Sequence, residues 1–316
     1  MRRWVIGALV MLVVGITGLF LSFGEGNPLD FGTEPYFEEK TIPADAVQNI
    51  QIKSDSLSID AIKGRSNDIV VRLEGNASSK YLDRFKLTAE QKGDTLYVDG
   101  SMDDYFTFGI NIVNVKMTVE LPEKVWESFE VTNKSGSIFV SDLQGDVMNV
   151  TTQSGNIKTE LVTVDELVSK VNSGNITLSD LRAKSAELKA TSGNIKLNGY
   201  TLDKLNFDLN SGSVELRDGT SEVTGELTSG NVRIDAKEIV KSIKLKLNSG
   251  DVSIRADKEP ESAKITFGTN SGSSRINWSS FNSVEDNDKS LSGTVGSGDE
   301  ILIDVKTTSG NLRINK

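Results

Sequence analysis

The sequence predicts an all-β protein: a β-solenoid of the parallel β-helix type, preceded by one N-terminal transmembrane helix. Three observations lead to this prediction. A Ser-Gly turn motif recurs at a nearly constant interval between Gly136 and Gly310, apolar and polar residues alternate on both sides of each motif, and an uncharged run lies near the N-terminus. A fixed repeat in this size range is typical of stacked, nearly identical units.

Residues 1–24 are expected to form a membrane anchor. Trp4 to Phe23 is a mainly apolar run without charge, long enough for a helix to cross a bilayer. Arg2 and Arg3 precede the run and acidic residues follow it, which predicts a single-pass protein of the cell membrane with a cytoplasmic N-terminus and an extracellular C-terminal domain. A cleaved signal peptide is the alternative, although no A-x-A site follows the run.

Two segments are expected between the anchor and the repeats. Residues 25–46 contain three prolines and several acidic residues, which is typical of a linker. Residues 47–133 are rich in strand patterns but poorly repetitive, and we expect them to cap one end of the solenoid, because an open hydrophobic core needs an atypical end unit. A candidate contact patch in this cap, predicted because it reads as a loop that carries aromatic rings, consists of Asp103, Asp104, Tyr105, Phe106 and Phe108.

Residues 134–316 are expected to form the solenoid, with a degenerate C-terminal cap. Successive motif glycines are 19, 19, 19, 19, 18, 20, 22 and 38 residues apart, and we interpret the last interval as one lost motif. Each unit is expected to comprise a strand, a tight Ser-Gly turn, a second strand and a loop of variable length. The motif pairs are Ser135-Gly136, Ser154-Gly155, Ser173-Gly174, Ser192-Gly193, Ser211-Gly212, Ser229-Gly230, Ser249-Gly250, Ser271-Gly272 and Ser309-Gly310.

The motif residues are expected to have a structural role. Glycine at the turn is expected to adopt a positive φ, which other residues adopt only at a cost, and the neighbouring Ser, Asn and Asp can bond the turn backbone. Stacking would then line these side chains up in a ladder. A catalytic row of serines is disfavoured because the chain has no histidine to activate them. An up-and-down sheet of antiparallel hairpins is the alternative fold, and parallel stacking is favoured because identical units then bury identical faces.

Composition limits the chemistry further. The formal net charge of −10 disfavours nucleic acid as a partner, since nucleic-acid binding needs a basic surface. The absence of histidine and cysteine removes most zinc, haem and iron–sulfur sites, so we expect no cofactor, no metal site and no catalytic residues. The expected partners are the membrane, through the N-terminal helix, and an envelope protein or wall component.

The Ser-Gly-Asn-Ile-x-Leu pattern over residues 134–316, behind a single N-terminal span, resembles a bacterial adhesin-like family of β-strand repeat domains. The short anchor and the acidic exported domain also resemble LiaG-like proteins of Bacillus and its relatives, which accompany a cell-envelope-stress sensing system. The resemblance implies a role in the cell envelope, and it brings no catalytic residues to this chain.

The function expected from the sequence is therefore non-enzymatic: a membrane-anchored extracytoplasmic protein that is adhesin-like in binding or associated with envelope stress. Two alternatives stay open. A self-associating surface scaffold is one, because exposed solenoid ends can stack. A polysaccharide lyase or hydrolase is the other, because parallel β-helices often carry such chemistry on one strand face, although the acidic residues here show no pairing that supports it.

Overall fold

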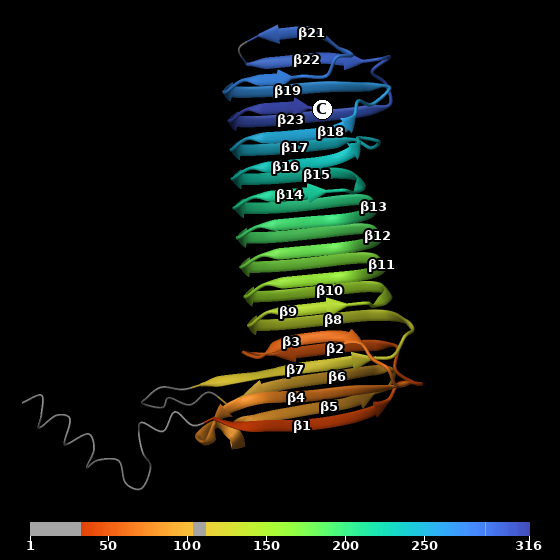
Figure 1. Ribbon diagram of the computed structural model, residues 1–316, viewed down its shortest axis with the longest axis vertical. Coiled ribbons are helices and arrows are strands. Elements are labelled where there is room, and N and C mark those ends of the chain that lie inside the picture. The colour runs from red at the N-terminus through yellow and green to blue at the C-terminus, as the bar shows by residue number, and fades with distance from the viewer. Residues whose placement is uncertain (1–32, 104–111, 288) are drawn as a thin grey trace, which may run out of the picture.

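The computed structural model describes residues 33–103, 112–287 and 289–316. These residues are mostly β-strand, as predicted, with one short 3-10 helix, η1 (Ser79–Arg84). The strands stack as the rungs of a rod (Figure 1). The predicted anchor lies outside the described residues, and within them we find no helix with the length and apolarity to cross a bilayer.

The middle of the rod consists of regular coils. We call the strands that precede each Ser-Gly turn the lead-in side and those that follow it the lead-out side. Neighbouring strands here pair in parallel, and each residue lies beside its counterpart in the next repeat, as Ile157 does beside Ile176. These strands are β8 (Val125–Ser135), β9 (Ile138–Ser141), β10 (Gln144–Ser154), β11 (Ile157–Ser173), β12 (Ile176–Ser192), β13 (Ile195–Ser211), β14 (Val214–Arg217), β15 (Thr220–Ser229), β16 (Val232–Glu238), β17 (Ile243–Ser249) and β18 (Val252–Lys258).

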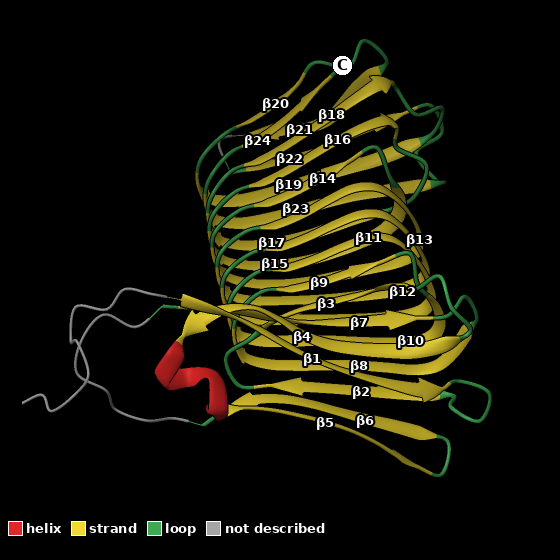
Figure 2. Ribbon diagram, turned by 60° about the horizontal axis from the view of Figure 1, so that its bottom comes forward, coloured by secondary structure: helices red, strands yellow, loops and turns green. Residues whose placement is uncertain are grey.

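Figure 2 shows the coils as flattened loops with bends at both edges. In β11, β12 and β13 one continuous strand runs along the lead-out side, bends, and returns along the lead-in side. Alternate residues point inward, so that the interior is one continuous cluster of buried apolar side chains from Ala44 to Ile314. The row two residues after each motif glycine is typical, because Ile157, Ile176 and Ile195 are all fully buried. Identical coils thus bury identical faces, as the parallel prediction requires.

The motif glycines stack on one another along one edge of the rod. Their φ angles are positive, for example 141° at Gly174. The Gly174 amide donates to the Ser192 carbonyl at 3.0 Å, and the same bond recurs from rung to rung. A Cβ on Gly174 would lie 1.8 Å from the carbonyl oxygen of Gly155. Glycine is therefore required both for its backbone conformation and for the close approach of the neighbouring rung.

The N-terminal end is closed by antiparallel strands. These are β1 (Thr33–Pro43), β4 (Asp68–Ser78) and β5 (Phe85–Lys92). On the lead-out side β7 (Val113–Leu121) pairs with β4, and β4 pairs with β1. On the lead-in side β6 (Thr95–Met102) pairs with β5. The rings of Tyr36 and Phe85 lie 4.7 Å apart and cover the end of the core between β1 and β5.

The structure corrects the linker prediction for residues 33–43, which form β1 rather than a linker. Three acidic residues hide the strand pattern in this segment. One of the three, Glu39, forms an ion pair with Arg72 on β4, which also contacts Glu120 on β7, both at 2.5 Å. Glu34 and Glu38 accept hydrogen bonds from the hydroxyl groups of Ser79 and Tyr36. Cross-strand ion pairs of this kind support strand pairing.

Within the predicted cap, residues 49–63 form a regular coil that is not at the end of the rod. This coil comprises β2 (Asn49–Ser54) and β3 (Ser58–Lys63). β2 pairs in parallel with both β6 and β8, and β3 with both β7 and β9. The first coil in the sequence is therefore enclosed between two later ones, as the orange strands of Figure 1 show.

The C-terminal end repeats this arrangement. Its strands are β19 (Ala263–Ser271), β20 (Ser274–Ile276), β21 (Phe281–Asn287), β22 (Ser290–Val295), β23 (Ile301–Ser309) and β24 (Leu312–Asn315). β23 pairs in parallel with β17 on one side and with β19 on the other, and β24 lies likewise between β18 and β20. The antiparallel pair β21–β22 continues the sheet beyond β19 and caps the rod.

The interpretation of the 38-residue interval as a lost motif is therefore wrong. Gly310 lies in the glycine stack between Gly250 and Gly272. The Gly250 amide donates to the Ser309 carbonyl at 2.9 Å, and the Gly310 amide donates to the Ser271 carbonyl at 2.9 Å. The interval is long because the chain first builds the next rung and the cap, and then returns to fill the gap that it left.

We expect Gly174→Ala to lower the free energy of unfolding by at least about 2 kcal/mol, because the methyl group meets a backbone carbonyl and the φ is strained. Gly268→Ala is the matched control, since a Cβ there has no heavy atom within 4 Å. Urea unfolding followed by circular dichroism measures both. Equal stability of the two variants would contradict the stacking of the glycines.

Candidate binding surface

The predicted serine-glycine pairs form the edge of the rod, as the repeat required. The nine motif serines are exposed, and no hydrogen bond of their Oγ atoms is present within the described part of the chain. The residue that follows each glycine makes the ladder instead. The Asn156 side-chain oxygen accepts bonds from the backbone amide and the side chain of Asn175, at 3.0 and 3.1 Å, and Asn175 repeats this with Asn194. The asparagines therefore stabilise the turns rather than forming a reactive row.

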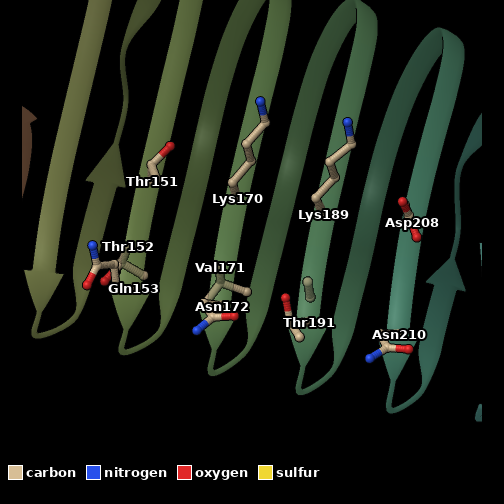
Figure 3. A pocket seen from close by; sticks show the side chains of 11 residues that line it. Thr151, Thr152, Gln153, Lys170, Val171, Asn172, Lys189, Thr191, Asp208 and Asn210 are labelled. Carbon is tan, nitrogen blue, oxygen red and sulfur yellow. The ribbon is translucent and has the colours of Figure 1, made fainter.

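Two further rows of side chains flank a groove on the lead-in side. The first, which we call the Asn/Thr row, lies two residues before each motif glycine; the second, the charged row, lies four residues before it. The residues between them point inward, so that a shallow depression runs along the rod with the buried side chains of Thr152, Val171, Ala190, Leu227 and Leu247 at its floor. Figure 3 shows part of this axial groove across successive strands.

The axial groove is continuous over several coils. One depression extends from Thr151 to Asn210 and a second from Asp208 to Thr308, and they share Asp208. The groove therefore follows the rod axis across β10, β11, β12, β13, β15 and β17 and reaches β23. A depression of this shape fits an extended ligand that lies along the axis, and does not enclose a small molecule.

The walls of the axial groove are regular in space. In rung order the Asn/Thr row reads Lys134, Gln153, Asn172, Thr191, Asn210, Thr228, Asn248, Thr308 and Asn270, all exposed. Asparagine and threonine alternate strictly from the third to the last position only because Thr308 is inserted before Asn270. In the same rung order, the charged row consists of two lysines, then two acidic residues, then two more lysines: Lys170, Lys189, Asp208, Glu226, Lys246 and Lys306. Amide, hydroxyl and charged groups thus repeat at the rung spacing of about 4.8 Å.

A third row of residues lies at the opposite bend of the coil and was not predicted from the sequence. One residue in each of five successive coils has a left-handed backbone: Asp142, Leu161, Asp180, Gly199 and Asp218, with φ between 50° and 67°. The sequence signal was present, since Asp or Gly occurs six residues after four of the five motif glycines. Asp and Gly tolerate this conformation and leucine does not. The row is a structural bend.

The predicted contact patch is only partly described. The Asp103 amide donates to the carbonyl of Arg84 at 3.1 Å, so this end of the patch is joined to η1. Asp104, Tyr105, Phe106 and Phe108 lie outside the described residues. The contact patch stays a prediction.

The described residues contain no group of three side chains that could hold a metal ion. Among the described residues three carboxyl groups, those of Glu187, Glu259 and Asp299, have clearly shifted pKa values, and all three pKa values are lowered by hydrogen bonds. A general acid in glycoside hydrolysis needs a raised pKa. These three groups are therefore suited to structural bonding rather than to acid catalysis.

Glu259 has the largest of these shifts. Its carboxylate accepts bonds from the Ser280 and Ser279 hydroxyls and from both backbone amides, which lowers its pKa to about 2. The bonds fasten the segment between β20 and β21. Trp278 in this segment is 4% exposed, and its indole NH donates to the Asn315 carbonyl at 3.2 Å. Glu259 thus joins this segment to the end of β18, and Trp278 joins it to the inserted coil.

Comparison with known proteins gives a family and a fold. Residues 47–315 match the family described as Toastrack DUF4097. No curated protein matches the chain. A "putative adhesin" from Parabacteroides distasonis ATCC 8503 is 12% identical with a TM-score of 0.52, over 88% of this chain and 96% of that one.

Two further solved structures are less similar. A "putative adhesin" from Bacteroides fragilis NCTC 9343 is 11% identical with a TM-score of 0.45, over 89% of this chain and 97% of that one. A "putative lipid binding protein" from Parabacteroides distasonis ATCC 8503 is 11% identical with a TM-score of 0.44, over 90% of this chain and 97% of that one. At such identities the likeness concerns the fold alone.

We expect Leu161→Gly to raise the free energy of unfolding by about 1 kcal/mol, because it removes the left-handed strain of a leucine. Leu161 is 58% exposed, so little packing is lost. Leu161→Ala is the control, because alanine loses the same side chain but keeps the strain. A gain in Leu161→Ala equal to that in Leu161→Gly, measured by urea unfolding, would contradict the assignment.

We expect Glu259→Gln to destabilise the C-terminal cap at pH 7. The folded-state pKa lies below the usual value of 4.5, so the ionised carboxylate stabilises the fold above about pH 4.5, and this contribution disappears as the pH falls towards 2. Urea unfolding followed by circular dichroism should therefore show a lower midpoint than that of the native chain at pH 7 and a similar midpoint near pH 2. Glu261→Gln, on a side chain that is 86% exposed, is the control. A difference that is independent of pH would contradict the role of Glu259.

Proposed function

The chain belongs to the Toastrack DUF4097 family, and we propose that it is a membrane-anchored, extracytoplasmic binding protein of the bacterial cell envelope. In this proposal the protein is adhesin-like and acts by contact, without catalysis. A place beside an envelope-stress sensing system, which the resemblance to LiaG-like proteins implies, belongs to the same proposal.

The axial groove is the observation that carries the proposal. It presents the same kinds of polar group on rung after rung, and its walls are exposed. A repeating surface of this kind suits a repeating or extended ligand, because each rung can make an equivalent hydrogen bond. The Asn/Thr row offers amide and hydroxyl groups, which can both donate and accept.

The position of the N-terminus supports display away from a membrane. The described chain begins at Thr33 in β1, which lies at the opposite end of the rod from β21 and β22 (Figure 1) and from β20 (Figure 2). The apolar run Trp4 to Phe23 lies before β1, and nine residues separate Phe23 from Thr33. An anchor there would hold the rod by one end and leave the groove and the far end free for contact.

The two ends of the rod disfavour the alternative of a stacking scaffold. At the N-terminal end the last strand of the lead-out side is β1, which contains Pro35 and Pro43, and at the other end the sheet finishes with the antiparallel pair β21–β22. Prolines on an edge strand oppose further pairing. Addition of another parallel coil at either end would also have to displace antiparallel strands.

We expect the full chain in non-ionic detergent to co-sediment with purified bacterial wall sacculi. Thr191→Tyr with Asn210→Tyr should reduce this binding about tenfold or more, because the two rings fill the middle of the axial groove. Lys196→Tyr with Asn198→Tyr, on the exposed lead-out side of the same coil, is the control. Equal binding of both double variants, or a reporter on the C-terminus that is active only in the cytoplasm, would overturn the proposal.

A further inference from the structure

Three arginines lie close together near the C-terminal end of the lead-out side. Arg255 lies on β18, Arg313 on β24 and Arg275 on β20, which are three consecutive rungs. All three are exposed, and within residues 33–103, 112–287 and 289–316 no ion pair joins them to a carboxylate. The insertion of the last coil places Arg313 between the other two, so this arginine triad exists only in the folded order of the rungs.

Arginines on the neighbouring rungs are compensated. Arg217 contacts Glu215 and lies 3.8 Å from Asp235, and Arg233 lies 2.8 Å from Asp235. Arg255 lies beside Asp235, but the Asp235 carboxylate contacts Arg233 and Arg217 instead. Beyond β18 the strands β24 and β20 contain no acidic residue. The positive charge of the triad therefore stands out on a chain whose formal net charge is −10.

The arrangement costs the fold some stability. Arg275 and Arg313 are direct neighbours in adjacent strands, and like charges directly opposite each other are destabilising. The nearby carboxylates do not relieve this. Asp251 accepts hydrogen bonds from the amide and side chain of Asn311 at 2.8 and 2.9 Å, and Glu259 is bound to Ser279 and Ser280. An anion from outside would complete the charge balance.

The surroundings suit an anion with several oxygens. Arg275 and Arg313 line a shallow depression together with Ser253, Ser273 and Ser274. Arginine binds phosphate in a bidentate manner, and serine hydroxyls add further donors. Arg275 and Arg313 lie opposite each other on adjacent rungs, about 4.8 Å apart, whereas Arg255 lies opposite Asn315 and is therefore on the diagonal from Arg313. Three such groups on three rungs fit charges that recur along a chain better than they fit one isolated ion.

We propose that the arginine triad, Arg255, Arg275 and Arg313, binds a linear polymer of phosphodiester units. The exposed aromatic rings among the described residues, Phe37 and Tyr97, lie in the N-terminal cap, so the triad has no platform on which bases could stack. This disfavours single-stranded nucleic acid. A lipid surface is disfavoured because the triad lies at the end of the rod away from Thr33, an argument that rests on the proposed anchoring.

The test uses fluorescently labelled synthetic poly(glycerol phosphate) and the full chain in non-ionic detergent. We expect binding to weaken with salt at a log–log slope of about −2, because three phosphate contacts on a single flexible chain contribute about 0.7 each. The triple variant Arg255→Gln/Arg275→Gln/Arg313→Gln should bind at least about tenfold more weakly, with a slope near zero. The three side chains are exposed, so its circular dichroism and unfolding midpoint should match those of the native chain.

The matched control is Lys170→Gln/Lys189→Gln/Lys246→Gln, which removes three positive charges from the axial groove instead. Undiminished binding by this control supports the triad as the site. Equal loss in both triple variants, undiminished binding in the arginine variant, or tighter triad-dependent binding to phosphatidylglycerol vesicles or poly(dT) than to the polymer would overturn the proposal. The sacculus assay on the groove variants decides the proposed function separately.

Discussion

The stacking of the motif glycines, from Gly155 onward, on the glycine carbonyl of the neighbouring rung is the constraint on which the rest of the structure depends. The contact leaves no room for a Cβ, as at Gly174, where it would lie 1.8 Å from an oxygen. It fixes the register of every coil, so residues at the same distance from the glycine form rows along the rod. The intervals of 18 and 20 residues do not disturb the rows. The shorter one is accommodated by a register shift between Thr201 and Lys204 in the β13–β15 pair, and the longer one by the connection between β16 and β17. The axial groove and the arginine triad both follow from this register.

The order of the rungs differs from the order of the sequence at both ends. The first coil, β2–β3, and the last, β23–β24, are each enclosed between coils that lie elsewhere in the chain. Enclosure gives each of these coils two parallel neighbours, and it leaves the ends of the rod to antiparallel strands that resist further pairing. It also creates surfaces that no sequence window contains. The alternation of Asn and Thr along the groove depends on Thr308, and the arginine triad depends on Arg313.

Much of this fold could be predicted from the sequence, because the repeat encodes it locally. The Ser-Gly turns, the positive φ of the glycines and the inward rows of Ile, Leu and Val all follow from one unit. The rung order could not be predicted, since identical motifs can pair with one another in any order. β1 was missed because three acidic residues hide its strand pattern, and their partners are not evident from the sequence: Arg72, which contacts Glu39, is 33 positions away. The left-handed bend was missed because Leu161 interrupts a row of Asp and Gly, and the arginine triad because its members are far apart in the chain.

Disulfide trapping tests the inserted C-terminal coil most directly, because the chain contains no cysteine of its own. In the structure residue 308 is on the rung beside residue 248, about 4.8 Å away, whereas residue 270 is two rungs from it. Disulfides form only when the Cα atoms are within about 7 Å. We therefore predict that mild oxidation cross-links Asn248→Cys/Thr308→Cys and leaves Asn248→Cys/Asn270→Cys reduced. The reverse result would show that the coils stack in sequence order and would contradict the account.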